Sequence, residues 1–243
     1  PQGRPIPVDS RSNDKWFQHA AIIVSDMDKA FRHLRRNKIR FASTAPQTLP
    51  KTIPNAAGIR AFYFKDFDNH VLEILQFPPD KGSPKWRDLA KTGKLFLGID
   101  HTAIVIGDTE ESLKFYRDAL GLAVAGGSEN FGTEQEHLNN VFGAKLRITG
   151  LRTREDGIAV EFLEYLAPRD GRDFPKDTKS SDLWHWQTSF AASKTDDLAM
   201  ILKQNRFDFI SGGVVSFDEN ALGFRKAFLA RDADGHAVRV IEK

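Results

Sequence analysis

Two segments of this chain repeat one phrase but differ at the position that decides its chemistry. Residues 64–77 read FKDFDNHVLEILQF and residues 229–243 read LARDADGHAVRVIEK, so Glu73 corresponds to Arg239. Period-two alternation puts Glu73 on one strand face with apolar neighbours such as Leu75. A carboxylate buried there needs a cation, a metal ion or hydrogen-bond donors. Glu73 is therefore a candidate metal ligand, whereas arginine, a permanent cation, cannot bind a metal ion.

The segments that must position these residues occur three times. Residues 16–41, 98–124 and 184–210 each contain a strand, a polar turn suited to a helix N-cap, and an amphipathic helix. Each copy continues into further strands, so the unit is βαβββ and the fold class is α+β. We expect module 1 at 15–80, module 2 at 98–168 and module 3 at 183–243, joined by linkers at 81–97 and 169–182.

A second repeat involves the linkers. GRPIPVDSRSNDKWFQH (3–19) aligns without gaps with GRDFPKDTKSSDLWHWQ (171–187). The second of these segments is the exit from module 2. Residues 1–14 are therefore predicted to be the exit from a module that is missing ahead of residue 1. A three-module protein that kept a spare linker is the alternative.

Composition narrows the function classes. The 243 residues carry 35 basic and 33 acidic side chains, a net charge of +2, in an interspersed pattern that predicts neither nucleic-acid nor membrane partners. The absence of cysteine excludes thiolate catalysis and cysteine metal sites. The chain starts with Pro1 rather than methionine, which indicates that the polypeptide has been processed or cleaved. The sequence does not distinguish a cytoplasmic protein from an exported one. No serine hydrolase or zincin motif is present.

Three βαβββ units, the phrase FYRDALGL in module 2, and strands ending in VLEIL and VEFLEY together resemble the vicinal oxygen chelate superfamily. That superfamily includes glyoxalase I, extradiol dioxygenases and bleomycin resistance proteins. The resemblance covers nearly the whole chain. It implies modules paired into half-barrel cups, with a divalent metal held by one residue from each first strand and one from each last strand.

The resemblance assigns the ligand positions residue by residue. The candidate metal ligands that it implies are His19, Glu73, His101, Glu161 and Gln187. Glu73 and Glu161 are also the candidate catalytic carboxylates, and Glu164 is an alternative to Glu161. Imidazole and carboxylate ligands with free positions for water suit Fe(II), Mn(II), Ni(II) or Zn(II).

Two further residues are candidates for substrate binding. Arg239 occupies the fourth ligand place of the expected pair of modules 2 and 3, where it would clamp a substrate anion, pair with Glu161 or simply point outward. His137 lies in a polar segment, 132–144, which would either cover the cup or form a solvated surface helix.

The module order suggests which cups form. We expect modules 2 and 3 to share one cup, with His101 and Gln187 facing a common cavity. Module 1 would then expose the apolar face around Glu73, and such a face seldom stays in water. A second chain in a homodimer, the missing module, or another part of this chain would cover it.

These expectations converge on a metal-dependent enzyme of the glyoxalase/dioxygenase type that acts on a small substrate through vicinal oxygens. The reaction stays open between a dioxygenase and a lyase or isomerase. The alternative is a metal-free protein of the bleomycin-resistance type, whose cup binds a small molecule.

Overall fold

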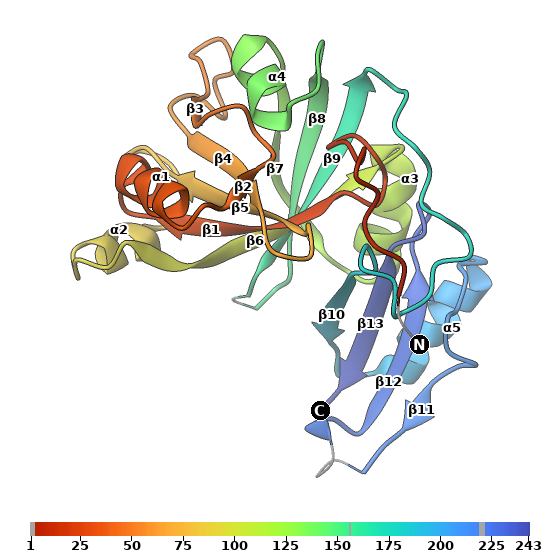
Figure 1. Cartoon of the computed structure of the whole chain (residues 1–243). Helices are drawn as coiled ribbons and strands as arrows, with labels where there is room; N and C mark the ends of the chain where they lie inside the picture. Colours follow the sequence, from red (N-terminus) through yellow and green to blue (C-terminus); the bar gives the residue numbers. More distant parts are fainter. Residues whose placement is uncertain (1–2, 156, 219–221) are drawn as a thin grey trace.

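The computed structural model describes residues 3–155, 157–218 and 222–243, and contains three βαβββ modules (Figure 1). Module 1 comprises β1 (Gln18–Val24), α1 (Met27–Arg36), β2 (Arg40–Phe41), β3 (Gln47–Thr48), β4 (Arg60–Lys65) and β5 (Val71–Gln76). Module 2 comprises β6 (Phe96–Ile106), α3 (Thr109–Leu113), the π-helical η1 (Lys114–Ala119), β7 (Ala123–Asn130), α4 (Thr133–Asn139), β8 (Lys145–Arg152) and β9 (Ala159–Ala167). Module 3 comprises β10 (Gln187–Ala191), α5 (Thr195–Gln204), β11 (Val215–Ser216), β12 (Lys226–Arg231) and β13 (Ala237–Glu242).

The polar turns after the first strands of modules 1 and 2 cap their helices, as the sequence predicts, whereas in module 3 the N-cap residue of α5 is Lys194, which makes no side-chain cap bond. The Asp26 side chain accepts a hydrogen bond from the Lys29 backbone N–H at the start of α1. Asp108 caps α3 in the same way, through the Glu111 backbone N–H. These bonds satisfy N–H groups that have no partner within the helix.

The strands form two separate sheets, one built by modules 1 and 2 together and one by module 3 alone. Modules 1 and 2 share a nine-stranded sheet in the order β2-β4-β5-β1-β6-β9-β8-β7, with β3 added beside β4. Its centre is the antiparallel pair β1–β6, flanked by the parallel pairs β1–β5 and β6–β9. Module 3 forms a separate sheet in the order β10-β13-β12-β11. Neither sheet closes into a barrel among the residues described.

The expectation that modules 2 and 3 share a cup is therefore wrong. They meet through their helix-covered faces, where Phe115 and Tyr116 of η1 pack in one core with Leu202 of α5 and Phe228 of β12. The linker between modules 1 and 2 explains the observed pairing. It contains α2 (Pro84–Ala90), whose Trp86 packs against β1 and β5 and folds the chain back so that β6 runs along β1.

Module 2 also covers the apolar face of module 1. Val71 and Tyr63 of module 1 share a core with Leu146 and Leu163 of module 2, all of them buried. The face that was expected to need a cover is thus covered within this chain, without a second copy. Among the described residues, no helix is long and apolar enough to cross a bilayer.

Candidate metal centre

The central strands bring three ligand-type side chains to one place. Ala21 of β1 lies opposite Glu73 of β5 on one side and opposite His101 of β6 on the other. His19 is two residues from Ala21 and faces the same way, because side chains alternate along a strand. Two modules therefore place His19, Glu73 and His101 on one face at nearly one level.

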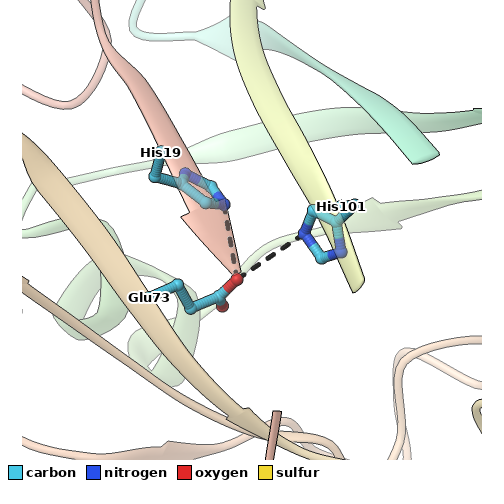
Figure 2. A group of neighbouring side chains, drawn as sticks. All are labelled: His19, Glu73 and His101. Carbon is cyan, nitrogen blue, oxygen red and sulfur yellow. Dashed lines mark ion pairs between the residues drawn. The ribbon is translucent and has the colours of Figure 1, made fainter. Parts of the chain in front are cut away.

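These three residues form a compact, buried cluster (Figure 2). The Oε2 atom of Glu73 lies 3.3 Å from His19 Nε2 and 3.6 Å from His101 Nε2. One ligand atom from each residue falls within 4.8 Å of the other two. Glu161 extends the cluster, since its Oε1 lies 3.7 Å from His101 Nε2.

The donor atoms of this cluster fit a metal ion. The Nε2 atoms of His19 and His101 are buried and have no hydrogen-bond partner among the described residues. Buried polar atoms are rarely left unbonded, and an unexplained pair of them points to a missing partner. A divalent cation at their meeting point would satisfy both imidazoles and the Glu73 carboxylate together.

A second layer holds His101 in position. The Asp100 carboxylate lies 3.2 Å from His101 Nδ1 and accepts a 2.7 Å hydrogen bond from Trp86 Nε1. Such a carboxylate keeps the proton on Nδ1 and leaves Nε2 free to bind a metal. Strand alternation alone would send the side chains of Asp100 and His101 to opposite faces. The pairing register of β1 and β6 shifts at this point, from Ala21 opposite His101 to Ile22 opposite Ile99, so Asp100 sits in a β-bulge that re-aims it.

Carboxylate groups outnumber cationic groups around the cluster. Burial by itself would lower the pKa of His101, but the carboxylates of Glu161, Asp100 and Glu73 outweigh it and raise that pKa to about 9. Burial and the neighbouring Glu73 raise the pKa of Glu161 above its ordinary value, although His101 opposes them. The site thus holds buried negative charge that a proton on His101 or a metal ion neutralises.

A cavity of about 970 Å³ opens onto this cluster. Its walls include Glu73, His101 and Glu161, with Tyr63 beside them and Arg152 farther along β8. The Glu161 side chain is 27% exposed, against 5% for Glu73, so Glu161 is the more accessible carboxylate. Burial and the neighbouring Glu73 raise the pKa of Tyr63 well above its ordinary value, which keeps its hydroxyl protonated as a donor.

The remaining predicted site residues lie elsewhere. Gln187 and Arg239 belong to the module 3 sheet and are absent from the cavity walls, so the structure does not bring Gln187 to His101. The Arg239 guanidinium donates a 3.1 Å hydrogen bond to Ser189 Oγ instead of pairing with Glu161. His137 is exposed, and its carbonyl accepts a hydrogen bond from the Thr44 backbone.

Two of the alternatives left by the sequence are decided by contacts. Glu164 is buried on the other face of β9 from Glu161, where it accepts hydrogen bonds from Thr109 and Arg147. Helix α4 does cover the cavity, but through Gln135 and Leu138. Sequence reasoning missed Asp100 and Trp86 altogether. The sequence does show an acidic residue directly before His101. Its role is apparent only from the bulge, which turns the Asp100 side chain toward His101.

Comparison with known proteins places these observations in a family. The chain aligns with glyoxalase I from Zea mays at a TM-score of 0.62 and 14% identity, over 97% of this chain and 70% of that one. A glyoxalase family protein from Bacillus cereus aligns at a TM-score of 0.51 and 14% identity, over 68% of this chain and 98% of that one. A putative dioxygenase from Bacillus subtilis aligns at 0.50 and 11% identity, over 96% and 63%. These likenesses concern the fold.

No curated protein sequence gives a significant match to this chain. The family model of the Glyoxalase/Bleomycin resistance protein/Dioxygenase superfamily matches residues 98–240, which is more than half of the chain. The match starts at the first strand of module 2 and ends in the last strand of module 3. This protein belongs to the Glyoxalase/Bleomycin resistance protein/Dioxygenase superfamily.

Proposed function

We propose that this protein is a metal-dependent enzyme that moves a proton on a small substrate carrying vicinal oxygens, a reaction of the lyase or isomerase type. One observation carries the proposal. The pair of modules 1 and 2 supplies an imidazole and a carboxylate twice, as His19 with Glu73 and as His101 with Glu161, around one point beside the cavity. In modules 1 and 2, the first-strand and last-strand positions that the resemblance names are all occupied by residues that can bind a metal ion.

The described residues can hold and use such a substrate. His19, Glu73 and His101 would hold a divalent cation, which when bound polarises a substrate carbonyl as a Lewis acid. Glu161 is the general base of this proposal, because it is the accessible carboxylate and its raised pKa moves it toward neutral pH. It removes a proton from the carbon beside the substrate oxygens and returns it to the neighbouring atom.

Other groups on the cavity wall orient the substrate. The Tyr63 hydroxyl remains a hydrogen-bond donor at neutral pH. Its ring lies beside the cluster, with its centroid 4.8 Å from that of the His19 ring. Leu75, Leu138 and Ile148 give the same cavity apolar walls, which exclude water around the reacting carbon. In the metal-free binding alternative, the buried Nε2 atoms of His19 and His101 would make no hydrogen bond and would have only the Glu73 and Glu161 carboxylates at 3.3 to 3.7 Å.

A dioxygenase is the second candidate, and the three-residue cluster favours it. Two histidines and one carboxylate with open positions form the ligand set of non-haem Fe(II) oxygenases. In that case Glu161 would stay outside the ligand set. Iron would then be the resident metal, and dioxygen would be consumed with the substrate.

The deciding experiment begins with metal content. The chain is purified without chelators, its metal is measured, and the apo form is titrated with Fe(II), Mn(II), Ni(II) and Zn(II). We expect close to one ion per chain, reduced at least tenfold in Glu73→Gln and unchanged in the control Asp88→Asn, which alters an exposed acid outside the cavity walls. Absence of a bound ion under every condition would exclude both enzyme proposals.

The reaction type follows from the loaded protein. Small substrates with a carbonyl next to a hydroxyl are incubated in deuterated water, and exchange at the carbon between them is followed by NMR. Glu161→Gln should keep the metal and lose exchange by about 10² to 10⁴-fold. Dioxygen consumption that survives in Glu161→Gln would identify the dioxygenase instead.

A further inference from the structure

The segment before module 1 and the linker between modules 2 and 3 contact each other through hydrogen bonds that obey twofold symmetry. The backbone N–H of Arg4 donates to Asp182 Oδ1 at 2.9 Å, and that of Arg172 donates to Asp14 Oδ1 at 3.0 Å. The guanidinium groups repeat the pattern, with Nη2 to Oδ2 distances of 2.7 Å in both pairs. Each contact therefore occurs twice, with the roles of the two linkers exchanged. We call residues 3–16 with 171–184 the linker clasp.

The aromatic layer of the linker clasp obeys the same symmetry. The Arg4 guanidinium stacks over Trp184, and that of Arg172 stacks over Trp16, each 4.7 Å from the ring centroid. Their indole N–H groups also match, since each donates to a hydroxyl in its own linker. An axis of pseudosymmetry must then pass between the linkers.

The axis extends into the modules themselves. His70 of module 1 has its Nε2 2.7 Å from the Leu183 carbonyl oxygen at the start of module 3. His236 of module 3 has its Nε2 2.8 Å from the Lys15 carbonyl oxygen at the start of module 1. The twofold therefore relates module 1 to module 3, while module 2 has no counterpart among the described residues.

The first strands of modules 1 and 3 are equivalent in register but not in surroundings. Ala21 pairs with Glu73 in module 1 as Ser189 pairs with Arg239 in module 3. However, β1 also pairs with β6, whereas β10 lies at the edge of the small sheet (Figure 1) and pairs with β13 alone in the part of the chain described. Ala21 is 0% exposed and Ser189 is exposed.

The open face of module 3 carries a cation without an acid. Arg239 bonds to Ser189 Oγ and stacks 5.6 Å over Phe224. No carboxylate of the described residues forms an ion pair with it. Gln187 stands in the place of His19, so this face lacks the ligands of the metal centre.

We infer that the β10 edge and the open face of module 3 bind a βαβββ unit built like module 2. The twofold of the linker clasp maps module 2 to this position, with its first strand antiparallel to β10 as β6 is to β1. The same operation maps the linker that leaves module 2 onto the linker that begins at Gly3. The inference does not depend on the metal-site proposal.

Charge supports this occupant over a second copy of module 3. The twofold puts Arg239 in the place of Glu73, which lies near Glu161 of module 2, since their carboxylate oxygens are 3.6 Å and 3.7 Å from the same His101 Nε2 atom. A module-2 unit would therefore set its own acid against the Arg239 cation. Two copies of module 3 would instead bring two arginines together.

The register predicts a specific cross-link. Ala20 lies opposite Thr102 in the β1–β6 pair, and Thr188 occupies the place of Ala20 in module 3. We would join a second copy of residues 97–170 ahead of Gly3 and place cysteines at Thr188 and at Thr102 of the added copy only. Because the chain has no cysteine of its own, the expected result is one intrachain disulfide on mild oxidation.

Hydrogen exchange gives a second readout without cysteines. The β10 amides, residues 187–191, should exchange about tenfold or more slowly in the extended chain than in the 243-residue chain. A matched control moves the second cysteine to Ser128 of the added copy, whose strand β7 is farthest from β6 in the sheet, and should give no disulfide.

Three results would overturn the inference. A folded added copy with unprotected β10 amides and no cross-link would show that the face does not bind it. An added copy that stays unfolded would do the same, because docking is what buries its apolar face. A disulfide-linked dimer of the unextended Thr188→Cys chain, with β10 protected, would show that a second copy of this chain occupies the edge.

Discussion

At the residue scale, the proposed metal centre depends on a carboxylate outside the cluster of His19, Glu73 and His101. Asp100 holds the Nδ1 side of His101, and Trp86 holds Asp100. An imidazole without such a partner can rotate or change tautomer, and the ligand atom is then misplaced. The bulge in β6 is thus as much a part of the site as His101.

We therefore expect Asp100→Asn to weaken metal binding by about 10 to 100-fold while the chain stays folded. The loss arises because an amide cannot fix the Nδ1–H tautomer as a carboxylate does. The metal affinity is measured by titrating the apo variant with Zn(II) or Mn(II) in the presence of a fluorescent chelator that competes for the ion. An affinity equal to that of the unmodified chain would remove Asp100 from the site.

At the element scale, the linker clasp takes the place of a rigid connection between modules 1 and 3. Asp14 is fully buried and accepts hydrogen bonds from the backbone of Arg11 and from the backbone and guanidinium of Arg172. Removing a buried acceptor leaves its donors unsatisfied, which costs more than the bond itself contributes.

Replacing Asp14 by alanine should lower the free energy of unfolding by about 3 kcal/mol, because several donors lose a buried charged partner. The exposed Asp9, which meets the same Arg172, supplies the matched control, and Asp9→Ala should cost less than about 1 kcal/mol. Urea denaturation of both variants measures the difference. Equal costs would show that the burial of Asp14 is irrelevant.

The linker clasp should also respond to acid. Burial would raise the pKa of Asp14, but the hydrogen bonds from Arg172 and Arg11 hold it below its ordinary value. A lowered folded-state pKa means that the stabilisation is present above about pH 4, the unfolded-state value, and is lost as pH falls through the folded-state pKa. Stability measured from pH 6 to pH 2 should therefore fall less steeply in Asp14→Asn than in the unmodified chain.

At the scale of the whole molecule, module 3 attaches to module 2 by helices and not by strands. Phe115 of η1 is 0% exposed, and the centroid of its ring lies 4.9 Å from that of Phe207, which follows α5 in the chain. This core lies behind the sheets, away from the face that carries the metal centre. The two functions of module 2, forming the site and holding module 3, are thus spatially separate.

Phe115→Ala should accordingly destabilise the chain by about 3 to 5 kcal/mol and loosen module 3. Metal affinity should change less than about threefold, since modules 1 and 2 alone form the site. Met200→Ala, at a half-exposed position of α5, is the control and should be nearly neutral. Loss of metal binding in a folded Phe115→Ala chain would contradict this separation.

The sequence alone determined the repeated βαβββ unit, because apolar periodicity and cap residues are local properties of each copy. The resemblance to the superfamily placed His19, Glu73, His101 and Glu161 at corresponding strand positions, and alternation independently supported the inward face of Glu73. The repeated linker sequence, at residues 3–19 and 171–187, was also recognisable from the sequence. These features depend on neighbours within a few residues, so they survive without knowledge of the partners.

Only the tertiary structure decided which modules pair. All three first strands have similar sequences, and the structure pairs β6 with β1 while Trp86 of α2, in the linker between them, packs onto module 1. Asp100 was invisible for a related reason, because a bulge changes strand parity through pairing with a distant segment. Long-range contacts of this kind have no local signature, and they give equivalent modules different surroundings: a buried His-Glu-His cluster in one case and an open face in the other.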